Sequence, residues 1–173
     1  SKFAQIIKKI INDVGLDPQY LEVEVTENVI INNPEVIHMI NEISKLGVKI
    51  ALDDFGTGTS TLSNLTKIHV DRLKIDRSFV QNIDLDHSDE IIIKAIIDMS
   101  HSLNYDVLAE GVETQKQLDF LKKKKCEIIQ GFYFGVPMDS EKLEAFVHTL
   151  DKSWSRSISR FSAEAPGHLW EPR

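Results

Sequence analysis

Helical and strand patterns alternate along most of this chain, and that alternation restricts its fold more than any other feature. Residues 3–14 repeat apolar side chains at helical spacing and stop at Gly15, whereas residues 21–25 alternate apolar and acidic side chains as a strand does. Further strands are expected at residues 48–55, 72–76, 106–111 and 127–132. Because strands linked through helices lie parallel with right-handed crossovers, the sequence predicts an α/β fold with a parallel sheet.

The helices between these strands are marked by capping residues as well as by periodicity. Thr114 and Gln117 have the spacing of a capping box, and Gly47 is expected to end the helix that Asn33 begins. The expected helices start at Asn33, just before Leu62, at Ser88, at Thr114 and at Ser140, and the last of them ends at Leu150.

The alternating pattern stops after residue 150. We therefore expect a domain over residues 1–150 and a separate tail over residues 151–173, which is rich in Ser and Arg. Such a tail is a linker, a vector-derived extension or a segment that depends on a partner, and no function is placed in it.

Composition and charge exclude several classes of function. With 173 residues, 42% of them hydrophobic, the chain is long enough for one domain with a sizeable core. Its formal net charge of −7 argues against a general nucleic-acid binder, and the basic run Lys122–Lys125 is expected to be a solvated helix end. Cys126 is the only cysteine, so disulfides and cysteine-rich zinc sites within the chain are excluded. We expect Cys126 to be a buried small side chain rather than a nucleophile.

The sequence shows no sign of a membrane segment. No apolar stretch approaches the ~18 residues of a membrane-spanning helix, and the chain does not open on a signal peptide. We therefore expect a cytoplasmic location and no membrane contact by this chain, although a longer parent protein could be anchored through another segment.

Polar side chains are expected to gather at one edge of the sheet. Successive side chains of a strand point to opposite faces, so in residues 48–55 the apolar side chains share one face and Asp53 lies on the other. The same rule applied to all five strands puts a polar group near each carboxyl end on what can be a common face: Glu24, Asp53, Lys74, Glu110 and Gln130. In a parallel α/β barrel the active site lies at that edge.

This set of residues favours a metal centre. Converging carboxylates repel one another unless protons or cations bridge them, and oxygen ligands without cysteine favour Mg²⁺ or Mn²⁺. The six histidines have no ligand spacing, so we expect them to be structural or exposed. Two divalent cations could polarise a phosphate ester and activate water. A Mg²⁺-dependent lyase or enolising barrel with Lys74 as the base is the other chemistry that this set allows.

Four motifs in order resemble the EAL domain family, the bacterial phosphodiesterases that linearise cyclic di-GMP. They read DDFGTGTSTLSNL, VDRLKIDRSFV, LAEGVET and QGFYFGVPM, and the similarity covers roughly residues 1–150. The resemblance implies a TIM-type (β/α) barrel, present here as a partial barrel of about five strands that lacks its N-terminal strands. It also implies two divalent cations, Mg²⁺ or Mn²⁺, and cyclic di-GMP as the substrate.

The resemblance assigns metal ligands residue by residue. Glu24 of EVTE matches a metal ligand of the family, and Asp53 matches the carboxylate that bridges both cations. Asp54 and Glu110 match ligands of the second cation.

Other residues match catalytic and supporting positions. Lys74 of LKID matches the lysine that helps to hold the attacking water, and Gln130 of QGF matches a residue near substrate and water. The catalytic residues implied are thus Lys74, Glu110 and Gln130. Glu27 matches the glutamate that anchors the loop after the two aspartates, and Glu113 matches a supporting carboxylate.

The chain departs from the family pattern in two ways. Thr59 stands where the family usually has an aromatic residue, and we expect this difference to alter how that loop packs or couples to a dimer partner. The Glu-Ala-Leu triplet and an asparagine ligand would lie upstream of Ser1, so we expect the rest of the domain or a second copy to cover the sheet edges. The alternative function is an inactive EAL module that senses the nucleotide or binds a protein. A sensor or GGDEF-type domain upstream is a further expected partner.

Overall fold

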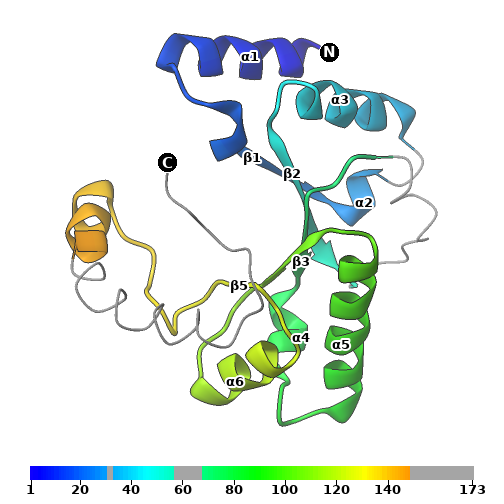
Figure 1. Cartoon of the computed structure of the whole chain (residues 1–173), viewed down its shortest axis with the longest axis vertical. Helices are drawn as coiled ribbons and strands as arrows, with labels where there is room; N and C mark the ends of the chain where they lie inside the picture. Colours follow the sequence, from blue (N-terminus) through cyan, green and yellow to red (C-terminus); the bar gives the residue numbers. More distant parts are fainter. Residues whose placement is uncertain (31–32, 57–67, 149–173) are drawn as a thin grey trace, which may run out of the picture. The chain divides into compact units, whose positions relative to one another are not determined.

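The computed structural model describes residues 1–30, 33–56 and 68–148. The chain divides into two compact units, residues 1–135 and residues 136–173. Within the described part of the first unit, parallel strands form a sheet of five in the order β1-β2-β3-β4-β5 (Figure 1). The parallel α/β sheet predicted from the alternating pattern is therefore confirmed.

Within the described residues, helical structure follows β1, β3 and β4, as the connections of a parallel sheet require. The strands are β1 (Glu22–Thr26), β2 (Lys49–Phe55), β3 (Arg72–Ile75), β4 (Asp106–Ala109) and β5 (Ile128–Ile129). The helices of this unit are α1 (Lys2–Val14), the 3₁₀ turn η1 (Pro18–Tyr20), α2 (Glu27–Ile30), α3 (Pro34–Ser44), α4 (Arg77–Gln81), α5 (His87–Ser102) and α6 (Gln115–Lys123).

One face of the sheet carries the hydrophobic core. On the central strand β3, Leu73 and Ile75 are fully buried, and the strand-facing side of α5 contributes the fully buried Ile93 and Ile97. Burying a side chain of this size stabilises the fold by about 1.5–3 kcal/mol. The opposite face carries charged side chains, among them Lys74, together with the buried Ala51 and Leu108.

Several element ends differ from the sequence expectation. The helix expected from Ser88 is α5, and Asp86 caps it by accepting a hydrogen bond from the backbone N–H of Ser88 at 2.8 Å. Both residue types cap helices, and the side chain of Asp86 is the one that reaches the free N–H groups here. Sequence periodicity did not predict η1, α2 or α4, because elements of three to five residues are too short to show a period.

The fifth strand is shorter than expected, since only Ile128–Ile129 pairs with β4. The chain after β5 pairs with Val112, which lies beyond the end of β4. Val112 N–H donates to the Gln130 carbonyl at 3.1 Å, and Tyr133 N–H donates to the Val112 carbonyl at 2.9 Å. A Cβ atom on Gly131 would lie 2.1 Å from the Val112 oxygen. Only glycine permits this approach of two backbones.

Other expectations fall partly or wholly outside the described residues. Residues 140–148 are helical, and Asp139 accepts a hydrogen bond from the Lys142 N–H at 2.9 Å, while the expected end at Leu150 lies beyond the described part. The helix through Leu62 and Leu65, the position of Thr59 and the tail after residue 150 also lie outside it. No helix in residues 1–30, 33–56 and 68–148 is long and apolar enough to cross a bilayer.

Cys126 is buried beside β4 and β5, as expected from its sequence context. Its Sγ lies 3.5 Å from the Ile128 carbonyl oxygen and 3.7 Å from that of Val107. Burial, with a smaller effect of Glu127, raises the pKa of the Cys126 thiol to about 12. At pH 8 only about one thiol in ten thousand would then be ionised.

We therefore expect native protein to resist alkylation by iodoacetamide at pH 8, because thiolate is the reactive species. Mass spectrometry should find negligible modification of Cys126 in the native protein and complete modification in guanidinium chloride. Rapid alkylation of the native protein would contradict this assignment.

Candidate functional site

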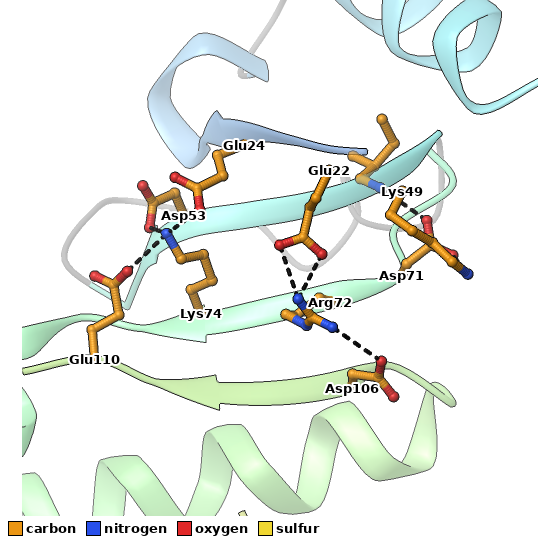
Figure 2. A network of polar contacts seen from close by, with 10 residues as sticks. Glu22, Glu24, Lys49, Asp53, Asp71, Arg72, Lys74, Asp106 and Glu110 are labelled. Atoms are coloured by element: carbon orange, nitrogen blue, oxygen red, sulfur yellow. Dashed lines mark hydrogen bonds and ion pairs between the residues drawn. The ribbon is translucent and has the colours of Figure 1, made fainter. Parts of the chain in front are cut away.

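Four charged side chains from four neighbouring strands meet near the carboxyl ends of the sheet. Lys74 lies on the central strand β3, Asp53 on β2 and Glu24 on β1, and Glu110 directly follows β4 (Figure 2). Side-chain parity puts them on one face of the sheet, and their side chains span the stagger that the strand register leaves between them. We call these four residues the Lys74 cluster.

The Lys74 ammonium is the centre of this cluster. Its Nζ lies 2.7 Å from Glu24 Oε1, 2.7 Å from Glu110 Oε1 and 3.0 Å from Asp53 Oδ1. The Lys74 side chain is only 4% exposed, whereas the carboxylates are 20–50% exposed. An ammonium has three N–H donors, so the three carboxylates use all of them.

Burial by itself would favour the neutral amine, but the hydrogen bonds with Glu110, Glu24 and Asp53 outweigh it. Together they hold the pKa of Lys74 above its usual value. Lys74 is therefore a charged ammonium throughout the physiological range, which argues against a role as a neutral general base.

A bulge in β2 places two aspartates opposite Lys74. Leu52 pairs with Leu73 and Phe55 pairs with Ile75, so two residues of β2 face a single residue of β3. The two residues are Asp53 and Asp54, and Asp54 adopts the left-handed conformation with φ 55°. Aspartate tolerates this conformation better than most residues, and a bulge re-aims neighbouring side chains. The two adjacent carboxylates have different partners, Lys74 for Asp53 and Asp76 for Asp54.

Asp54 points toward a second acidic residue. Burial, with the carboxylates of Asp53 and Asp76, raises the pKa of Asp54, and a side-chain hydrogen bond joins Asp54 to Asp76. Asp76 also caps α4, where it accepts a hydrogen bond from the Ser78 N–H at 2.9 Å. Although burial opposes the shift, hydrogen bonds with Ser78 and Asp54 lower the pKa of Asp76. The pKa shifts of the two carboxyl groups are therefore opposite, raised for Asp54 and lowered for Asp76.

The donor chemistry of this edge fits a divalent cation, but the geometry is that of an ammonium complex. Carboxylate oxygens are the preferred ligands of Mg²⁺ and Mn²⁺. However, among the described residues no group of three or more His, Cys, Asp or Glu side chains is arranged to hold a metal ion. The three carboxylates of the Lys74 cluster instead stand 2.7–3.0 Å from Nζ, wider than the roughly 2.1 Å of Mg²⁺–oxygen bonds.

The other residues expected at the site lie around this cluster. Glu27 is 4% exposed and its Oε2 accepts a hydrogen bond from the Gly56 N–H, at 3.4 Å, where the chain leaves β2. Glu113 pairs with Arg77 at 2.9 Å. Gln130 is exposed just after β5, and its backbone bridges Ala109 and Val112.

A second group of charges occupies the same face near the amino ends of the strands. Arg72 of β3 lies 2.7 Å from Glu22 of β1 and 3.6 Å from Asp106 of β4 (Figure 2). Glu22 and Arg72 have the same strand parity as Glu24 and Lys74, but sequence reasoning assigned neither of them a role. The shared strand parity of these residues was the sequence signal that could have predicted both the Lys74 cluster and the group around Arg72.

Comparison with known proteins gives consistent matches. A family model described as "EAL domain" matches residues 1–137. The cyclic di-GMP phosphodiesterase NbdA of Pseudomonas aeruginosa is 40% identical over 142 residues, which are 82% of this chain and 18% of that protein. The bifunctional diguanylate cyclase/cyclic di-GMP phosphodiesterase MucR of the same organism is 40% identical over 134 residues, 77% of this chain and 20% of that protein. The chain therefore spans about a fifth of these curated relatives.

Solved structures agree with these sequence matches. The structure of a MucR phosphodiesterase in complex with c-di-GMP has a TM-score of 0.76 at 37% identity, over 79% of this chain and 56% of that one. A manganese and cyclic di-GMP complex of Klebsiella pneumoniae BlrP1 has a TM-score of 0.72 at 30% identity, over 77% of this chain and 34% of that one.

Proposed function

The chain belongs to the EAL domain family, and from this premise we propose that it carries one side of the active site of a cyclic di-GMP phosphodiesterase. The observation that carries the proposal is the convergence of Glu24, Asp53 and Glu110 on Lys74 at the carboxyl edge of a parallel sheet. Relatives named as cyclic di-GMP phosphodiesterases, and one solved with manganese and the nucleotide, support it. We propose that the catalytic domain includes residues 1–150 and that residues 151–173 are a tail.

The roles proposed for individual residues follow from their positions. Glu24, Asp53, Asp54 and Glu110 would hold divalent cations, Mg²⁺ or Mn²⁺, and those cations when bound would polarise the phosphodiester and acidify water. Lys74 would present an N–H to the attacking water and neutralise charge that develops on the phosphate.

Three further residues would support the site from around the cluster. Gln130, at the neighbouring strand end, would contact substrate and water. Glu27 would hold the start of the loop after β2 through Gly56, and Glu113 would orient Arg77 at the same sheet edge.

We propose that further βα units complete the site at the free edge of β1. β1 ends the sheet order, so its outer edge has no strand beside it among the described residues. The helix before it, α1, buries Ile7 and Ile11 but exposes a second apolar stripe: Phe3, Ile6, Ile10 and Val14. The exposed apolar stripe of α1 and the open edge of β1 would both be covered by the next helix and strand of a barrel.

The proposed occupant of that edge is the N-terminal part of an EAL barrel, which would bring the remaining ligands. A second copy of this chain is the other arrangement that would cover it. Because cyclic di-GMP is a bacterial second messenger, we propose that the chain acts in the cytoplasm, under control of a sensor or GGDEF-type domain such as the one implied by the bifunctional name of MucR.

The direct test joins this chain to the N-terminal part of the MucR phosphodiesterase that it does not match. The fusion is expected to convert cyclic di-GMP to the linear dinucleotide with Mn²⁺ or Mg²⁺, measured by liquid chromatography. The 173-residue chain alone is expected to show negligible turnover, because it supplies only part of the ligand set. A folded fusion that binds the nucleotide without hydrolysing it would instead favour the sensing module.

A further inference from the structure

The Lys74 ammonium stands where the carboxylates of the proposed site converge. Nζ contacts oxygens from β1, β2 and the end of β4, so a single cationic atom links three strands to β3. Lys74 is also nearly excluded from solvent. Three carboxylates gathered around one point repel one another, and the ammonium offsets that repulsion.

This arrangement conflicts with the role proposed for Lys74 during hydrolysis. All three N–H donors of Nζ point at carboxylates, which leaves none for a water molecule. At least one carboxylate must therefore leave Lys74 before it can hold the attacking water. The same oxygens are the ones proposed to hold cations, and three carboxylates against one ammonium leave an excess of negative charge that attracts them.

We propose that Lys74 is a built-in counter-ion of the metal-free site, and that Glu24, Asp53 and Glu110 exchange its ammonium for a divalent cation when the site is loaded. The exchange frees an N–H of Lys74, so Lys74 can donate a hydrogen bond to the attacking water only after the cation has bound. Lys74 links β1, β2 and the end of β4 to β3 at this edge of the sheet. This inference rests on the metal site of the proposed function, and not on the hydrolysis itself.

Lys74→Met tests the exchange because methionine keeps most of the side-chain volume and removes the charge. Without its internal competitor, the full chain is expected to bind Mn²⁺ at least about tenfold more tightly, measured by electron paramagnetic resonance without nucleotide. In EDTA the same variant is expected to melt about 10 °C below the wild type, since the carboxylates lose their cation, and Mn²⁺ should restore most of that loss.

Lys49→Met is the matched control. Like Lys74, Lys49 extends from the polar face of the sheet and pairs with a carboxylate, Asp71 at 2.8 Å. It lies at the opposite end of the strands, however, and its side chain is 48% exposed (Figure 2). Its replacement should leave the Mn²⁺ affinity unchanged and shift the melting temperature by less than about 3 °C. Equal Mn²⁺ affinity of wild type and Lys74→Met overturns the proposal.

Asp53→Asn separates the failure of this inference from the failure of the metal site. If Asp53→Asn weakens Mn²⁺ binding while Lys74→Met does not tighten it, the metal site stands and the exchange is wrong. If Asp53→Asn binds Mn²⁺ as the wild type does, the metal assignment fails and the exchange fails with it. Weakening by the first variant and tightening by the second supports both.

A measurement on the wild type covers the case in which Lys74→Met does not fold. In ¹⁵N-lysine-labelled metal-free protein, the buried and fully bonded Lys74 ammonium should give a slowly exchanging NMR signal. Added Mg²⁺ is expected to shift or broaden that signal and to leave the Lys49 signal in place. A Lys74 signal that does not respond to Mg²⁺ overturns the proposal.

Discussion

Replacing Asp53 with asparagine in the fused EAL domain is expected to reduce the rate of cyclic di-GMP hydrolysis by about a thousandfold. Asparagine keeps the size of the side chain and an oxygen that can accept the hydrogen bond from the Asp54 N–H, which is 3.1 Å long in the structure. What is lost is the negative charge between Lys74 and the proposed cations. The variant should therefore fold normally and fail in catalysis, which circular dichroism and product analysis can separate.

Asp98→Asn is the control for this prediction. Asp98 is also an aspartate paired with a lysine, Lys94, but it lies on the exposed side of α5 and is itself 60% exposed. Its replacement should leave turnover within about twofold of the unsubstituted fusion. Unaltered hydrolysis in Asp53→Asn would contradict the site assignment as a whole.

Gly131→Ala is expected to destabilise the protein by about 3 kcal/mol. The added Cβ would lie 2.1 Å from the Val112 carbonyl oxygen and 2.3 Å from the Val112 nitrogen, and both of these are backbone atoms that cannot rotate away. The substitution would separate the chain after β5 from the end of β4 and break the hydrogen bonds of Val112 with Gln130 and Tyr133. Urea denaturation of the full chain measures this loss directly.

Gly15→Ala is the matched control for that substitution. Gly15 follows α1 with φ +70°, and no atom lies within 4 Å of the position of an added Cβ. The cost there should be the left-handed backbone alone, about 1 kcal/mol. If Gly131→Ala were no more destabilising than Gly15→Ala, the close approach of the two backbones would be wrong. Loss of activity in a Gly131→Ala fusion would in turn link this contact to the placement of Gln130.

Local sequence patterns predicted the elements well wherever they were long. The regular spacing of Ile7 and Ile11 marks α1, and the alternation around Leu73 marks β3, because the period of an element is written in consecutive residues. Elements of one turn, such as α2 and α4, carry no period, and the exact cap of α5 depended on which of two capping residues reached the helix end. The core-facing and polar faces of each strand could also be distinguished from local sequence, because successive side chains alternate between the two faces.

The sequence by itself therefore determined the parallel α/β class, the polar face with Glu24, Asp53, Lys74 and Glu110, and the resemblance to the EAL family. Only the tertiary structure decided which of these groups meet. The β2 bulge that sets Asp53 against Lys74 and turns Asp54 toward Asp76 depends on register between strands, which residues far apart in the sequence fix jointly. That register makes Lys74 the centre of the site, because its ammonium is the charge around which three strands arrange their carboxylates.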